Sequence, residues 1–260
     1  MLIQLIRNAG QMTPQQMILS ALLMFFALAL SFSVHEFMHA FVANKLGDDI
    51  PRLQGRVTLN PIAHLDPMGT LLILIVGFGW GKPVMYNPNN LYKLKSKRLM
   101  NFMGHLAGVT GNFVLALLSM IIVTIVMMLT GTKTMLPAVD VAYYLVAGID
   151  GVGAPLPAVA IVYVFYYVYT FSIMLMAFNL IPIPPLDGSH VLMELLPYRV
   201  RYSDGFMKFE KFAPMVLLAL ILMGSFTNVD VLQLIVNIIA FPAEFVISLI
   251  CGFIGYLGYL

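Results

Sequence analysis

The sequence predicts an all-α polytopic membrane protein with about five to six transmembrane segments. Sixty per cent of its 260 residues are hydrophobic and only 10% are charged, and the mean hydropathy is +0.91. Soluble globular domains carry about 25% charged residues. Several apolar stretches also approach the roughly 20 residues that a helix needs to cross a bilayer. These observations exclude the soluble globular class.

The first predicted span covers residues 17–42, and residues 17–34 of it contain no formal charge. It continues directly into His35-Glu36-Phe37-Met38-His39, the H-E-x-x-H pattern of a zinc peptidase. Residues four apart share one helix face, so His35 and His39 can offer two imidazole nitrogens to one metal. Glu36 is then placed to act on a metal-bound water as general base. The alternative is a helix whose polar residues face a cavity in a structural or proton-conducting role.

The next segment, residues 45–67, is polar and interrupted by glycine and proline, which predicts a loop. Within it, residues 56–59 favour a short β-strand, so we expect small β elements in the loops. Residues 68–80 are apolar but number only thirteen and include three glycines. This stretch is too short to span the bilayer unaided. It predicts a re-entrant hairpin or a short tilted helix.

A second span is predicted at residues 101–130, where Gly104, Gly108 and Gly111 allow another helix to approach closely. A third is predicted at residues 158–181, terminated by Pro182-Ile183-Pro184-Pro185. Two last spans are expected at about residues 214–225 and 229–257. We expect them to be accessory C-terminal spans, within residues 213–258.

Twelve of the fourteen Lys and Arg residues follow the first span or the third span. By the positive-inside rule both loops are cytoplasmic and the first helix runs from outside to inside, provided that residues 68–80 do not cross. The net charge is only +2, and the basic residues in these short loops suit anionic lipid. Nucleic-acid binding is therefore not supported. Cys251 is the only cysteine, which excludes an intrachain disulfide, and no cleavable signal peptide is expected.

A third ligand is offered by Asp187, which follows the third span at its cytoplasmic end. This is the leaflet that His35 and His39 reach in the predicted topology. Two histidines and a carboxylate leave an open position, as in catalytic zinc sites, so we expect one zinc per chain. The alternative is that Asp187 only caps a helix after the proline turn.

The two motifs together, His35-Glu36-x-x-His39 and Asn179-Leu-Ile-Pro-Ile-Pro-Pro-Leu-Asp187-Gly188, resemble those of the site-2 protease family of intramembrane zinc metalloproteases. The resemblance covers roughly residues 17–195 and extends to residues 80–84 and 107–112. It implies a three-span catalytic core, with zinc held by His35, His39 and Asp187 and with Glu36 as the catalytic glutamate. It implies hydrolysis of transmembrane protein or peptide substrates near the cytoplasmic side of a membrane, here expected to be a prokaryotic cell membrane. With no room for PDZ or CBS domains, residues 1–260 are expected to form a single domain that resembles a minimal member.

Other polar residues are weaker candidates. Asn112 could contact the oxyanion or the substrate, or instead form a hydrogen bond between helices. His64 and Asp66 could line the entrance or cap a loop, and His190 could contact a metal ligand. An extended segment at residues 82–87 or 56–59 could hold an unwound substrate by β-addition.

Two other functions remain open on the sequence alone. One is an inactive homologue that binds transmembrane clients without cutting them. The other is a metal or ion transporter, which predicts inverted repeats, and we find no internal repeat. The sequence names neither the substrate nor the oligomeric state.

Overall fold

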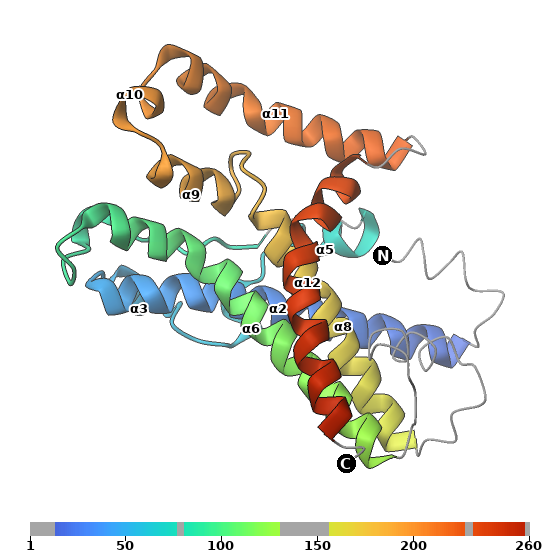
Figure 1. Cartoon of the computed structure of the whole chain (residues 1–260). Coiled ribbons are helices and arrows are strands. Elements are labelled where there is room, and N and C mark those ends of the chain that lie inside the picture. The colour runs from blue at the N-terminus through green and yellow to red at the C-terminus, as the bar shows by residue number, and fades with distance from the viewer. Residues whose placement is uncertain (1–13, 77–80, 131–155, 227–230, 258–260) are drawn as a thin grey trace.

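Three long helices, α2 (Pro14–Leu46), α6 (Lys97–Leu129) and α8 (Leu156–Asn179), pack against one another at the centre of the protein (Figure 1). The computed structural model describes residues 14–76, 81–130, 156–226 and 231–257. A fourth long helix, α12 (Val231–Leu257), packs on α6 and α8. Within the described ranges, these are the four helices long and apolar enough to cross a membrane, and no strand occurs. The all-α membrane fold is therefore confirmed.

The predicted spans match these helices closely. Helix α2 begins at Pro14, a residue that suits a first helical turn. Helix α6 begins four residues before the expected start, because the Ser96 hydroxyl accepts a hydrogen bond from the Leu99 amide at 3.1 Å and caps the helix. Helix α8 ends at Asn179, just before the prolines that cannot continue it.

Small and apolar side chains pack α2, α6 and α8 together. On α2, Ala27 is fully buried against Val168 of α8. The Ser172 hydroxyl of α8 donates to the Ser31 hydroxyl at 3.0 Å, a contact that satisfies both groups away from water. On α12 six of the exposed large apolar residues recur every three or four positions and form one stripe, which is the pattern of a lipid-facing surface: Leu234, Ile238, Phe241, Phe245, Leu249 and Phe253.

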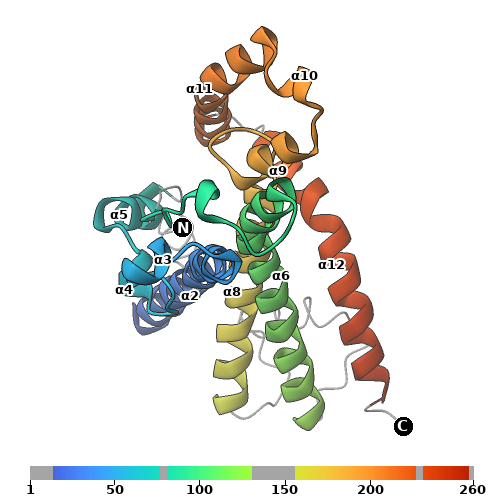
Figure 2. The ribbon, with the colours of Figure 1, turned by 90° about the vertical axis from the view of Figure 1, so that its left-hand side faces the viewer.

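Short helices α3 (Ile50–Leu53), α4 (Pro61–His64) and α5 (Pro67–Val76) lie on the side of α2 away from α6 and α8 (Figure 2). Ten residues of helix cover about 15 Å, half of a hydrocarbon core, so α5 by itself does not cross a bilayer. A 3-10 turn, η2 (Pro88–Asn90), precedes α6.

The short strand expected at residues 56–59 is not formed, which corrects that prediction. These residues form bends, with the Thr58 amide bonded to the Arg56 carbonyl at 2.9 Å. The Arg56 side chain binds the Ala63 carbonyl, and His64 Nε2 lies 2.8 Å from the Thr58 carbonyl. The Thr58 carbonyl, which a partner strand would otherwise bind, is thus contacted by a local side chain.

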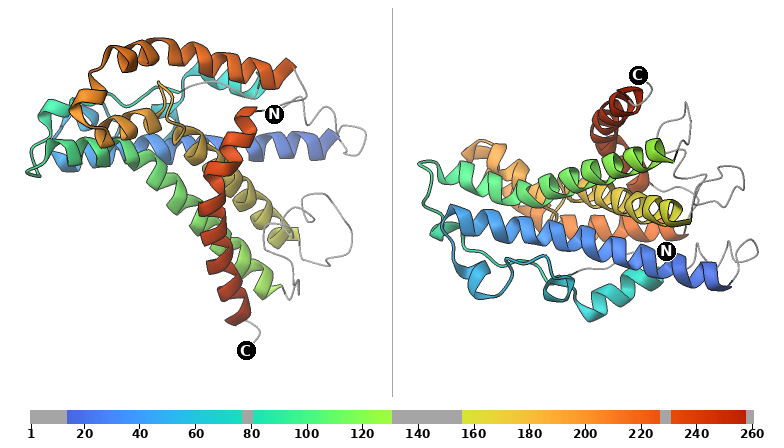
Figure 3. Two further views of the ribbon diagram at one scale, coloured as in Figure 1. Left: turned by 45° about the horizontal axis from the view of Figure 1, so that its top comes forward. Right: turned by 90° about the horizontal axis from the view of Figure 1, so that it is seen from below.

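After α8 the chain forms α9 (Asp187–Leu195), α10 (Tyr198–Arg201) and α11 (Asp204–Phe226), which extend beyond one end of the bundle (Figure 1). Helix α9 packs on α6, whereas α11 contacts α10 and α12. Helix α11 begins ten residues before the span expected at 214–225, because the Ser203 hydroxyl accepts a hydrogen bond from the Phe206 amide at 3.3 Å. Seen from below, α2, α6 and α8 lie side by side (Figure 3).

Candidate metal centre

Three potential ligand atoms meet where α2, α6 and α9 converge. The Nε2 atoms of His35 and His39 lie 3.2 Å apart, and each is 3.1 Å from Oδ2 of Asp187. Both histidines are buried on α2, and Asp187 is the first residue of α9. Segments 148 residues apart in the chain therefore meet at one point.

These distances fit a zinc ion. Two ligands held about 2.0–2.1 Å from a tetrahedral ion lie about 3.3 Å from each other, and the three observed separations are 3.1–3.2 Å. The donor set of two imidazoles and one carboxylate is one that zinc prefers, and three protein ligands leave a fourth position open for chemistry. The residues present thus fit a catalytic zinc site.

The segment between α8 and α9 positions Asp187. Pro182, Pro184 and Pro185 interrupt the helix, and the chain folds back so that Gly188 lies directly on the end of α8. A Cβ atom at Gly188 would lie 2.2 Å from the Leu180 carbonyl oxygen, closer than any side chain allows. Glycine is therefore required at position 188, directly after Asp187, because only glycine permits this approach.

Helix α6 supports both histidines from one face. His39 Nδ1 donates to the Gly104 carbonyl at 2.8 Å, which keeps the proton off Nε2 and frees that atom for a metal. The Asn112 amide lies 3.3 Å from His35 Nδ1 and is fully buried. Between them, a Cβ at Gly108 would lie only 2.4 Å from His39 Nε2, so the predicted close approach of a helix at this glycine is confirmed. The Gly104 carbonyl was not predicted, since a backbone acceptor has no signature in sequence.

Glu36 follows His35 directly in the chain and is buried, but it does not belong to the group of three ligand residues. Its Oε2 atom accepts a hydrogen bond from the Val84 amide at 3.0 Å. Val84 belongs to an irregular segment, residues 81–87, whose ends are also fixed: the Lys82 amide donates to the His64 carbonyl at 2.7 Å, and the Asn87 amide to Asp48 Oδ2 at 2.6 Å. No sequence pattern predicts the contact between Val84 and Glu36.

The charges around the centre shift the pKa values of two groups outside the spans, Asp187 and Tyr86. Burial by itself would raise the pKa of Asp187, but the adjacent His39 and His35 hold that pKa well below its usual range. Burial raises the pKa of Tyr86, and the carboxylates of Asp187 and Glu194 raise it further. Tyr86 therefore stays a neutral phenol, with its hydroxyl 3.3 Å from the ring nitrogens of His105.

His190, one turn after Asp187, stacks on His105 of α6 with ring centroids 4.7 Å apart. Another turn along α9, the buried Glu194 carboxylate binds Arg201 through two contacts of 3.1 and 3.2 Å and accepts from the Asn101 amide at 3.3 Å. A polar seam thus joins α9 to α6 beside Asp187. Contact between His190 and a metal ligand stays a prediction.

His64 and Asp66 lie in the loop between α3 and α5. His64 is fully buried on α4, and the Asp66 carboxylate accepts from the Gly69 amide at 2.9 Å at the start of α5. Both residues therefore help to hold the segment between α3 and α5 in place. Their role at an entrance stays a prediction.

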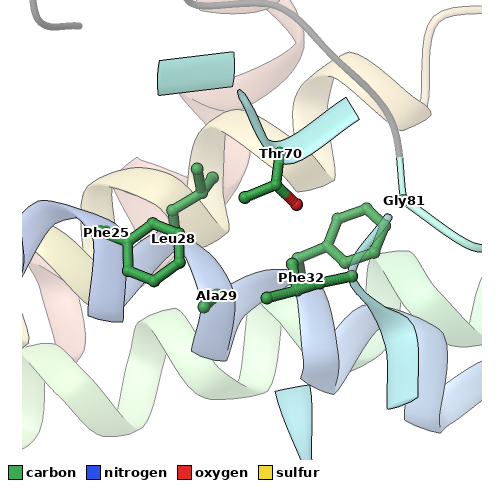
Figure 4. A pocket seen from close by; sticks show the side chains of 7 residues that line it. Phe25, Leu28, Ala29, Phe32, Thr70 and Gly81 are labelled. Atoms are coloured by element: carbon green, nitrogen blue, oxygen red, sulfur yellow. The ribbon is translucent and has the colours of Figure 1, made fainter. Parts of the chain in front are cut away.

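A small apolar hollow lies beside α2, on the N-terminal side of the His35–His39 motif (Figure 4). No ionisable group lines it, so it offers nothing that could hold a metal or activate water. Its lining consists of Phe25, Leu28, Ala29, Phe32, Leu65, Thr70 and Gly81.

Comparisons with known proteins agree with this geometry. The family model of peptidase family M50 matches residues 23–224. The chain is 38% identical over 174 residues to YwhC of Bacillus subtilis, covering 67% of this chain and 69% of that protein. It is 27% identical over 164 residues to Rip2 of Mycolicibacterium smegmatis, covering 61% of this chain and 51% of that protein. Both relatives carry the name zinc metalloprotease. No solved structure matches the chain significantly.

Four apolar helices and bacterial relatives indicate a multi-pass membrane protein of a prokaryote. Both motifs that converge at the metal centre lie inside the range matched by the family model. The chain belongs to peptidase family M50, the site-2 protease family of zinc metallopeptidases.

Proposed function

We propose that this protease binds its one zinc through His35, His39 and Asp187 and uses Glu36 as general base to cut peptide bonds in or near transmembrane segments. The observation that carries the proposal is the meeting of three ligand atoms within 3.1–3.2 Å on two helices far apart in sequence. Glu36 supports it by being adjacent to the ligands yet outside the ligand set, as an acid–base group requires.

Zinc, when bound, supplies a Lewis acid that polarises the scissile carbonyl and acidifies the attacking water. The protein's own part is to hold and move one proton. The Val84 amide fixes Oε2 of Glu36 at 3.0 Å, which orients the carboxylate so that it can accept the proton of the attacking water. Glu36 then delivers this proton to the leaving amine, and the carboxylate is regenerated.

We propose that the centre lies toward the cytoplasmic side. Lys45 follows His39 by six residues of helix, about 9 Å, and Lys97 precedes Gly104 by seven, about 10 Å. Arg98 binds the backbone carbonyls of Glu194 and Leu196, so the basic residues gather at the end of the bundle that holds the metal centre. The positive-inside rule assigns that end to the cytoplasm.

We propose that an unwound substrate pairs with residues 82–87, rather than with 56–59, because the former segment contacts Glu36. The amides of Lys82 and Val84 bond to the His64 carbonyl and to Glu36, and the side chain of the next residue, Met85, is exposed. A substrate strand added there would pass beside the catalytic carboxylate.

For the whole chain we propose a single membrane-embedded domain over residues 1–260. Its three-span catalytic core would cover about residues 17–195, and the accessory spans would lie in about residues 213–258. The packing of α2, α6, α8 and α9 around the metal centre supports the core, and the looser contact of α11 with α12 and α10 supports an accessory role. Together with the four apolar helices α2, α6, α8 and α12, α11 would make about five spans.

The test is the zinc content of purified, detergent-solubilised protein beside its His39→Ala and Asp187→Ala variants. We expect about one zinc per chain in the parent and loss of zinc in both variants. The matched Glu36→Gln variant should keep its zinc and lose cleavage of single-span reporter proteins. Parent-like zinc binding by Asp187→Ala would refute the ligand set, and full activity of Glu36→Gln would refute the mechanism.

A further inference from the structure

Asn112 is a fully buried side chain whose amide contacts one of the proposed zinc ligands. Its Nδ2 atom lies 3.3 Å from His35 Nδ1, and its Oδ1 atom is buried with no hydrogen-bond partner. Oxygen and nitrogen of an asparagine amide have the same shape, so the two orientations of this amide differ only in their hydrogen bonds. Which orientation holds depends on where His35 keeps its proton.

With the amide nitrogen toward His35, Nδ1 accepts a hydrogen bond and a neutral ring carries its proton on Nε2. Nε2 lies 3.1 Å from Asp187 Oδ2, so that proton would stand in the space that a metal would take. With Oδ1 toward His35, Nδ1 donates and Nε2 is free to bind the metal. Only the second arrangement is compatible with His35 as a zinc ligand.

We propose that Asn112 is a positioning residue that accepts a hydrogen bond from His35 Nδ1 through Oδ1 and so holds His35 in the zinc-binding tautomer. The inference rests on the proposed ligand role of His35. It makes Asn112 the counterpart of the Gly104 carbonyl, which accepts from His39 Nδ1 at 2.8 Å. Residues 104, 108 and 112 share one face of α6, and Gly108 provides the space in which both imidazoles approach.

This role replaces direct contact of Asn112 with the oxyanion. If Oδ1 of Asn112 accepts a hydrogen bond from His35 Nδ1, it supports the imidazole ring on the side opposite to the metal. Removing such a support reduces metal affinity by about 10- to 100-fold in other metal sites. If Asn112 had only a structural role, its replacement would affect folding, and zinc affinity would not depend on whether the new side chain can accept a hydrogen bond.

The experiment measures zinc affinity by competition with a chromophoric chelator. We expect Asn112→Leu, which has similar size but no acceptor, to bind zinc about 10- to 100-fold more weakly than the parent. Asn112→Asp, which presents only acceptors, should bind zinc at least as tightly as the parent. As a control, Thr124→Val removes a buried hydroxyl of α6 that donates to the Met120 carbonyl, and it should leave zinc affinity unchanged.

Parent-like affinity in Asn112→Leu would overturn the inference, and so would a tenfold loss in Asn112→Asp. The second variant keeps the test decisive if Asn112→Leu fails to fold. The His35→Ala variant distinguishes the ligand role of His35 from the positioning role of Asn112. If it loses zinc while Asn112→Leu does not, only the role of Asn112 is wrong, whereas zinc retained in His35→Ala would refute the ligand set itself.

Discussion

The substitution Gly108→Ala adds a single methyl group directly against the metal centre. The new Cβ would lie 2.4 Å from His39 Nε2 and 2.7 Å from His35 Nε2. Ordinary contacts of this kind are about 3.5 Å, so the imidazoles or α6 would have to move by about 1 Å. Displacements of this size in a catalytic site can reduce the rate by about 100-fold.

Folding should respond far less than metal binding. Alanine is favoured over glycine inside a helix by about 1 kcal/mol, which offsets part of the roughly 1–3 kcal/mol that overpacking costs. We therefore expect a helical, monodisperse protein with strongly weakened zinc binding, measured by chelator competition and by cleavage of a single-span reporter. Gly252→Ala on α12 is the matched control, because its Cβ would meet no atom within 4 Å. Zinc affinity and activity equal to those of the parent in Gly108→Ala would refute the packing argument.

Three further variants probe the parts around the centre. Glu36→Gln should reduce peptide cleavage at least 100-fold without loss of zinc, since it removes only the proton acceptor, and residual cleavage near the parent rate would exclude Glu36 as the base. Asp48→Asn should lower the stability by about 2 kcal/mol, because this buried carboxylate accepts three hydrogen bonds, one from the start of α3 and two from the segment before α6; thermal unfolding identical to that of the parent would contradict this. Glu194→Gln should cost about 2 kcal/mol, less than a fully buried ion pair, because its partner Arg201 is 25% exposed. An unchanged melting temperature in Glu194→Gln would show that the pair contributes nothing.

The long helices and the meeting of His35, His39 and Asp187 could be predicted, because each depends on a pattern within a short stretch of chain. Apolar length predicted α2, α6 and α8, and the i, i+4 spacing put His35 and His39 on one face. The proline segment and the charge distribution placed Asp187 at the same end of the bundle as the two histidines. The structure brings all three together.

The supports of the centre could not be predicted, because they depend on contacts between distant segments. A carbonyl such as that of Gly104, or an amide such as that of Val84, is present at every residue and becomes specific only when another segment lies against it. The strand expected at 56–59 failed for a related reason: β-propensity has effect only where a partner strand is available. The early start of α11 had a signal, the capping residue Ser203, that apolar periodicity does not detect.

Because 148 residues separate His39 from Asp187, a metal bound by both also links two distant parts of the chain. A bound ion acts as a cross-link that closes a loop of that length. By loop-closure entropy such a link is worth up to about 4 kcal/mol, and helices already inserted in a bilayer have less freedom to lose. Chelation would therefore release α9 and the seam that it forms with α6, and zinc-free protein should become sensitive to proteases between α8 and α10 while its spans stay folded.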